Sequence, residues 1–212
     1  MSKYILFDFD GTLVQSEDIL LSMYNELCPG KDYKTITKED IEKLRNYSLI
    51  EKCKMLGISV YKIPKMYSES KKIYRKYLGA IGLKDGVADM LHELKNKGFR
   101  MDILSSNDAD IICDFVKSKD IALFDNIYSS NNLFGKHHAI KNYLKKHHLT
   151  EKDIWYVGDE VRDIVSCKKA GVKVIAVTWG YDSDQILSKE QPDYLVRKPN
   201  EILDILLDLS KN

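Results

Sequence analysis

The chain has 212 residues, of which 44% are hydrophobic and 31% are charged, and its net charge at pH 7 is +1. This length and composition predict one globular domain, with room for a modest insertion, and exclude intrinsic disorder. The balanced charge argues against nucleic-acid binding, and no apolar run reaches the roughly 18 residues that span a bilayer. Because the N-terminus shows no signal-peptide cleavage site and the cysteines show no ligand-like spacing, we expect a cytoplasmic protein with free thiols.

Continuous apolar runs predict strands that are buried on both faces of a parallel sheet. In chain order, these strands are expected at residues 4–7, 101–104, 154–157 and 174–177, with weaker candidates at 126–129 and 194–196. Helical patterns lie between them, at residues 87–94, about 137–147, 164–170 and from Pro199 onward. Strands that alternate with helices in this way predict an α/β fold with a doubly wound, Rossmann-like parallel sheet.

Residues 14–81 interrupt this alternation with a helical stretch that contains no convincing strand. We expect helices over residues 17–27, after Thr37, after Ser48 and after Pro64. Thr37 and Ser48 each stand three residues before a carboxylate, which is the capping-box pattern of a helix start. We therefore predict an α/β catalytic core made of residues 1–13 and 82–212, with an all-helical cap domain, residues 14–81, inserted after the first strand.

Polar side chains follow three of the predicted strands at the points where the strands end. Asp8 and Asp10 follow the first, Ser105–Asp108 the second, and Asp159 and Asp163 the third. Because the carboxyl ends of parallel strands lie at one edge of a sheet, we expect these side chains to meet there. Two carboxylates about 4 Å apart repel each other by roughly 4 kcal/mol at an effective dielectric of 20, so the group requires a cation. An all-oxygen set of donors suits Mg²⁺ better than zinc.

The same residues resemble the motifs of the haloacid dehalogenase superfamily of phosphohydrolases. Asp8-Phe9-Asp10-Gly11-Thr12 is similar to the first motif, Ser106-Asn107 to the second, Lys136 to the third, and Gly158-Asp159 with Asp163 to the fourth. The helical stretch resembles, in position and character, the caps of the phosphoglycolate-phosphatase-like branch. The resemblance implies a Mg²⁺-dependent phosphatase that acts on a small phosphorylated metabolite, as a monomer or homodimer.

The resemblance also implies a catalytic role for four residues. Asp8 is the expected nucleophile, which forms an aspartyl-phosphate, and Asp10 is the expected general acid and base. Ser106 would donate a hydrogen bond to the phosphoryl group, and Lys136 would neutralise charge on that group and on the nucleophile. Ser105 and Lys141 are the neighbouring alternatives to these two residues.

Binding roles are implied for a further set of residues. The expected substrate-binding residues are Gly11, Thr12 and Asn107. The expected Mg²⁺ ligands are Asp8, Asp10 through its backbone carbonyl, Asp159 and Asp163. The backbone amides at Gly11 can contact phosphate where the chain turns away from the strand.

Several alternatives stay open at this stage. Asp10 argues against cleavage of carbon–halogen bonds, because a halide needs no proton when it leaves, and it also argues against the phosphonate-cleaving members of the superfamily. A sugar phosphomutase shares both aspartates, and a non-catalytic binding module could keep the same fold. Gln15 stands where phosphoglycolate-phosphatase-like sequences often carry an acid, which weakens the assignment of phosphoglycolate as the substrate. Specificity resides in the cap, and the sequence does not identify the metabolite. Arg45, Tyr47 and Lys52 are cap residues that could face it.

Overall fold

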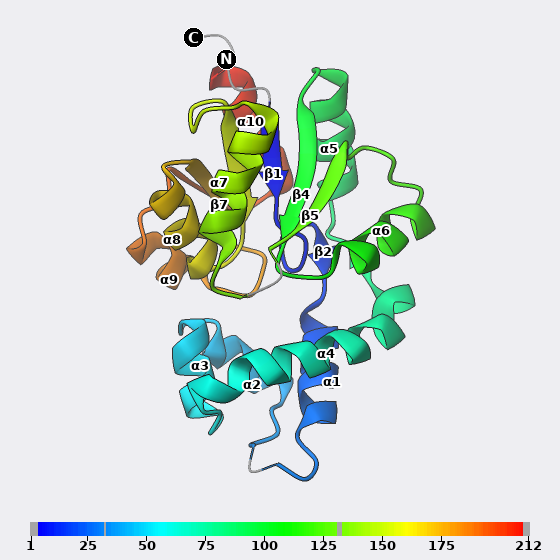
Figure 1. The fold of residues 1–212 in the computed structure, drawn as a ribbon, viewed down its shortest axis with the longest axis vertical. Coiled ribbons are helices and arrows are strands. Elements are labelled where there is room, and N and C mark those ends of the chain that lie inside the picture. Colours follow the sequence, from blue (N-terminus) through cyan, green and yellow to red (C-terminus); the bar gives the residue numbers. More distant parts are fainter. Residues whose placement is uncertain (1–3, 32, 131–132, 210–212) are drawn as a thin grey trace.

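The computed structural model describes residues 4–31, 33–130 and 133–209. Figure 1 shows a sheet flanked by helices at one end of the molecule and a smaller group of helices at the other. The predicted core has the outer limits 1 and 212, and both of these residues lie outside the described part of the chain. Within the described part of the chain, no helix is long and apolar enough to cross a membrane.

A parallel sheet of six strands forms the core. The strands are β1 (Tyr4–Phe7), β4 (Arg100–Ser105), β5 (Asn126–Ser129), β6 (Ile154–Gly158), β7 (Lys173–Val177) and β8 (Tyr194–Val196). Their spatial order is β5-β4-β1-β6-β7-β8, so the strand order reverses beside β1. Phe7 at the end of β1 lies opposite Ile103 of β4 on one side and opposite Val157 of β6 on the other. The ends of these three strands therefore meet where open α/β sheets bind ligands.

Helices cover both faces of this sheet and explain the continuous apolar runs. The helices of the core are α5 (Val87–Asn96), α6 (Ala109–Ser118), α7 (Lys136–His147), α8 (Val161–Ala170), α9 (Asp184–Lys189) and α10 (Pro199–Leu209). Successive residues of a strand point to opposite faces, so Ile5 and Phe7 pack with α5, α6 and α10, while Leu6 packs with α7, α8 and α9. The predicted doubly wound fold is confirmed, with α6 and α9 as helices that the sequence patterns leave unassigned.

The cap consists of helices that follow the first strand. They are α1 (Glu17–Leu27), α2 (Lys38–Leu44), α3 (Leu49–Met55) and α4 (Ile63–Tyr77), with single 3₁₀ turns at η1 (Val60–Lys62) and η2 (Leu78–Ala80). Thr37 and Ser48 form the predicted capping boxes: each side chain accepts the backbone N–H three residues later. Tyr24, Cys53 and Ile63 belong to a small apolar cluster of the cap's own.

A short strand pair lies where the chain leaves the core and returns to it. Strand β2 (Val14–Gln15) pairs antiparallel with β3 (Gly82–Leu83). The expectation that residues 14–81 contain no strand is therefore wrong for its first two residues. The pairing partner is about 70 residues away, and a two-residue strand has no periodicity of its own that could reveal it.

Candidate active site

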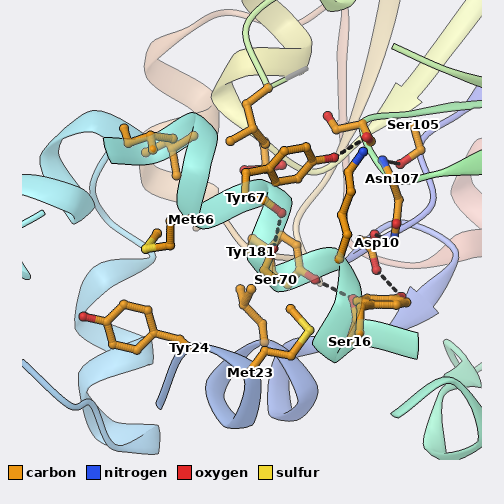
Figure 2. Close-up of a pocket in the computed structure, with 18 of the residues that line it drawn as sticks. Asp10, Ser16, Met23, Tyr24, Met66, Tyr67, Ser70, Ser105, Asn107 and Tyr181 are labelled. Carbon is orange, nitrogen blue, oxygen red and sulfur yellow. Dashed lines mark hydrogen bonds between the residues drawn. The ribbon is translucent and has the colours of Figure 1, made fainter. Parts of the chain in front are cut away.

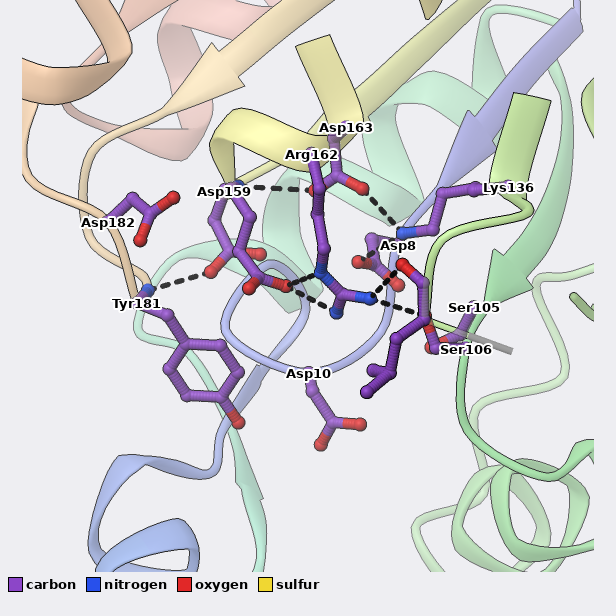
Figure 3. A network of polar contacts seen from close by, with 12 residues as sticks. Asp8, Asp10, Ser105, Ser106, Lys136, Asp159, Arg162, Asp163, Tyr181 and Asp182 are labelled. Carbon is purple, nitrogen blue, oxygen red and sulfur yellow. Dashed lines mark hydrogen bonds and ion pairs between the residues drawn. The ribbon is translucent and has the colours of Figure 1, made fainter. Parts of the chain in front are cut away.

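The predicted site residues converge at the carboxyl ends of β1, β4 and β6. Asp8 follows β1, Ser106 follows β4, and Asp159 and Asp163 follow β6, while Lys136 begins α7. None of these five side chains is more than 4% exposed. Figure 3 shows them gathered in one polar network. Charged groups at this depth require partners, so the pairing of each one decides what it can do.

Asp8 is held as an ionised carboxylate by a buried lysine. Lys136 Nζ donates to Asp8 Oδ2 at 2.7 Å and to Asp163 Oδ1 at 2.5 Å, and the N–H of Phe9 donates to Asp8 Oδ1 at 2.8 Å. Burial raises the pKa of Asp8, but the positive charges of Lys136 and Arg162 outweigh it, so this pKa lies below its usual value. Asp8 is thus an unprotonated carboxylate at neutral pH, as a nucleophile requires.

Asp10 has the opposite electrostatic setting. Its Oδ1 accepts a hydrogen bond from Tyr74 Oη at 2.6 Å, and its Oδ2 accepts one from Asn107 Nδ2 at 2.9 Å. Burial raises the pKa of Asp10 to about 6, and the two hydrogen bonds counteract only part of that rise. A carboxyl group with a pKa near the working pH can both give and take a proton.

Asp159 connects the loop after β1 to the loop after β7. Its Oδ1 accepts from Thr12 Oγ1 at 2.8 Å, and its Oδ2 accepts from the N–H of Tyr181 at 2.7 Å. Gly11 has φ +74°, and a Cβ there would lie 2.2 Å from Asp159 Oδ2, so only glycine fits beside this carboxylate. Burial and the neighbouring Glu160 carboxylate raise the pKa of Asp159 well above its usual value.

Three buried carboxylates have the arrangement that a hard divalent cation needs. Asp8, Glu160 and Asp163 each offer one oxygen, and these oxygens all lie within 4.8 Å of one another. Oxygen donors of this kind fit Mg²⁺. Burial raises the pKa of Asp163 to about 6, although the positive charges of Lys136 and Arg162 lower it in part. Among the described residues, this group of three carboxylates includes neither Asp159 nor the side chain of Asp10. The role of Asp159 and Asp10 as ligands therefore stays a prediction.

Several residues of the network were not selected by sequence reasoning. Arg162 Nε and Nη2 donate to Glu160 Oε2 at 2.7 and 2.5 Å, and Arg162 Nη1 donates to Ser106 Oγ at 2.8 Å. Glu160 and Arg162 both lie between Asp159 and Asp163, so their position inside the fourth motif was the available signal. Tyr74 and Tyr67, which donates to the carbonyl oxygen of Ser106, come from the cap, where no motif marks them.

The structure also separates the predicted residues from their alternatives. The Ser106 hydroxyl contacts Arg162 inside the network, whereas the Ser105 Oγ accepts the N–H of Asn107 at 3.2 Å. Lys136 is buried and Lys141 is exposed. Of the residues predicted to bind substrate, Asn107 donates to Asp10 and Thr12 donates to Asp159, so each of them orients one of the predicted site carboxylates.

Two of the three cap residues that were candidates for facing the substrate, Arg45 and Lys52, contact the core. Arg45 Nη2 donates to the carbonyl oxygen of Thr178 at 2.8 Å, and Lys52 Nζ pairs with Asp182 Oδ1 at 2.5 Å. Tyr47 is 40% exposed. Arg45 and Lys52 thus connect the cap to loops that follow β7.

Comparison with known proteins agrees with this fold. The sequence model of the haloacid dehalogenase-like hydrolase family matches residues 5–177. A phosphoglycolate phosphatase from Synechococcus elongatus is 29% identical, and the alignment covers 98% of each chain. A pyrophosphatase, PpaX, from Bacillus velezensis is 27% identical, and the alignment covers 95% of this chain and 94% of that one. A haloacid dehalogenase-like hydrolase from Streptococcus pneumoniae superposes with a TM-score of 0.78 at 26% identity, over 97% of this chain and 98% of that one. A crystal structure of a predicted phosphatase from Clostridium acetobutylicum, 20% identical, shares the fold with a TM-score of 0.84 over 98% of this chain and 99% of that one.

The fold and the matched motifs define the class of protein. The chain belongs to the haloacid dehalogenase-like hydrolase family, as the resemblance of its motifs predicted. It is a phosphatase of that family, a phosphoric monoester hydrolase. The predicted resemblance to the phosphoglycolate-phosphatase-like branch with a helical cap is confirmed as well.

Proposed function

We propose that this phosphatase hydrolyses a small phosphate monoester through an aspartyl-phosphate on Asp8, with Mg²⁺ as its cofactor. The observation that carries the proposal is the buried contact between Asp8 and Lys136, at the edge of the sheet where Asp10 also lies. A carboxylate kept ionised beside a carboxyl group with a pKa of about 6 provides a nucleophile and an acid in one cavity. The cytoplasmic location stays a prediction.

The protein groups account for each step of the reaction. Asp8 attacks phosphorus, and the bond from phosphorus to the leaving oxygen breaks while Asp10 gives that oxygen its proton. Asp10 then takes a proton from the water that attacks the aspartyl-phosphate, which releases phosphate and restores Asp8. The negative charge on the phosphoryl oxygens shifts during these steps. Hydrogen-bond donors for these oxygens come from Lys136, Arg162 and the Ser106 hydroxyl.

The carboxylate cluster supports a bound Mg²⁺. Asp8, Glu160 and Asp163 would hold it, together with Asp159 and the backbone carbonyl of Asp10 as the motif resemblance implies. When bound, the ion adds positive charge beside the phosphoryl group. Lys136 lies between Asp8 and Asp163, forms an ion pair with each of them and so already neutralises part of their charge.

Residues 14–81 are proposed to act as a cap domain over this cavity. Cap side chains reach the core loops at Asp10, Ser106 and Asp182. The contact from Tyr74 covers part of the Asp10 carboxyl group, which must transfer a proton. The names of the related proteins make phosphoglycolate and pyrophosphate the first substrates to consider.

Release of phosphate from p-nitrophenyl phosphate tests the proposed function. The wild type should turn over with Mg²⁺ and stop after chelation, and Asp8→Asn should lose at least about a thousandfold in kcat because an amide is a poor nucleophile. Asp120→Asn, at an exposed position in the turn that follows α6, is the matched control. Substantial turnover by Asp8→Asn, with the folded circular dichroism spectrum, would exclude Asp8 as the nucleophile.

A further inference from the structure

The catalytic carboxylates open into a large cavity between the core and the cap. It holds about 1030 Å³, with the open solvent at its mouth included. Figure 2 shows Asp10, Ser105 and Asn107 on the core side of this cavity and Met23, Tyr24 and Met66 on its cap side. The phosphoryl group must lie near Asp8, so the remainder of a substrate extends from there toward the cap.

Apart from Lys71, the described residues on the cap side of this cavity are uncharged and mostly apolar. Helix α1 contributes Leu20, Met23 and Leu27, and α4 contributes Ile63 and Met66. An apolar wall of this kind favours a ligand that removes apolar surface from water. It offers no compensation to a charged group that loses its own water.

The two cations that line the cavity are already paired with carboxylates. Lys71 Nζ binds Asp108 and lies 4.8 Å from the centre of the Tyr67 ring. Arg162 spends two of its nitrogens on Glu160 and a third on Ser106. Arg162 also lies at the phosphoryl end of the cavity. Among the described lining residues, Lys71 is therefore the one cation on the cap side, and the carboxylate of Asp108 already balances its charge.

Building on the proposed phosphatase function, we infer that the substrate is a phosphate monoester with an uncharged, largely apolar leaving group. A second carboxylate or phosphate that reaches the apolar cap wall would lie against Met23, Leu27 or Met66, none of which carries a compensating charge. This separates the chain from the two relatives whose names specify phosphoglycolate and pyrophosphate, since both compounds carry a second anionic group.

An alkyl phosphate series tests the inference. Ethyl, butyl and hexyl phosphate share one chemistry and differ only in apolar length, and each buried methylene contributes roughly 0.8 kcal/mol, which is about fourfold in kcat/KM. We expect kcat/KM to rise by about that factor with each methylene until the cavity is filled, and to exceed the values for phosphoglycolate and pyrophosphate. Hydrolysis that is independent of chain length, or fastest with phosphoglycolate or pyrophosphate, would overturn the inference. Absence of turnover with every compound, p-nitrophenyl phosphate included, would instead overturn the proposed function.

A charge introduced on the cap side provides a second test on the same substrates. Met66→Lys places a cation beside the expected leaving group and should lower the ratio of kcat/KM for hexyl phosphate to that for phosphoglycolate by at least about tenfold. Met55→Lys is the matched control, because Met55 is 45% exposed on the same cap and does not line the cavity, and it should leave the ratio unchanged. Leu20→Lys, at a lining position that is 42% exposed, replaces the first variant if Met66→Lys does not fold. An unchanged ratio in the folded variant would contradict an apolar binding surface.

Discussion

Removing the charge of Lys136 should expose how strongly the site depends on it. Its ammonium is 1% exposed and lies between Asp8 and Asp163, which are 2% and 0% exposed. Lys136→Met keeps an unbranched side chain that is one heavy atom shorter, but it leaves two buried carboxylates without their shared partner. Breaking a buried ion pair by removing one partner costs about 3–5 kcal/mol. For a chain of this size, that corresponds to a fall of roughly 6–20 °C in Tm.

The assay is thermal unfolding in the presence of EDTA, followed by circular dichroism. Lys136→Met/Asp163→Asn should recover part of the lost Tm, because the second change removes one of the orphaned carboxylates. Lys141→Met is the matched control, since Lys141 lies exposed on the same helix, and should change Tm by no more than about 2 °C. A Tm for Lys136→Met equal to that of the wild type would refute the electrostatic role that we assign to this lysine.

Three further predictions follow from the contacts around Asp10 and Asp159. Tyr74→Phe removes one of the two hydrogen bonds that orient Asp10. For alkyl phosphates kcat should fall by about tenfold or more, and for p-nitrophenyl phosphate it should fall less because that leaving group needs no proton. Equal losses for the two kinds of substrate would contradict the role of Tyr74 in orienting Asp10. Because the pKa of Asp10 is about 6, its protonated fraction falls as the pH rises through 6. Over the same range, kcat for alkyl phosphates should fall more steeply than kcat for p-nitrophenyl phosphate. Superimposable pH profiles for the two substrates would count against Asp10 as the acid. Gly11→Ala should lower the free energy of unfolding, measured with urea, by about 1–2 kcal/mol because of the backbone conformation alone, and by more if Asp159 is displaced. A free energy of unfolding equal to that of the wild type would contradict the close contact between Gly11 and Asp159.

The core was predictable because local and global signals agree there. Strand β1 is continuously apolar since Ile5 and Phe7 face one layer of helices and Leu6 faces the other. Its carboxylates follow directly, so the topology of a parallel sheet was sufficient to predict that Asp8 would approach residues more than 100 positions away. Short elements escaped prediction: α9 spans six residues, which is fewer than two helical turns.

The details of the site depended on information that a single sequence lacks. The motif resemblance selects Asp159 as a ligand, but the direction of its side chain follows from its bonds with Thr12 and with the backbone of Tyr181. The next residue, Glu160, joins the carboxylate cluster instead. Tyr74 reaches Asp10 across 64 residues of chain, a contact fixed by how the cap docks on the core rather than by any local pattern.

Detection of the phosphorylated enzyme is the most direct test of the central claim. The wild type is mixed with substrate and Mg²⁺, quenched in acid within milliseconds, and digested for mass spectrometry, with hydroxylamine treatment as a check for an acyl phosphate. The account predicts a phosphate on Asp8 that hydroxylamine removes, and none in Asp8→Asn. A phosphate on another residue, or full turnover with no phosphorylated enzyme at any time, would contradict it.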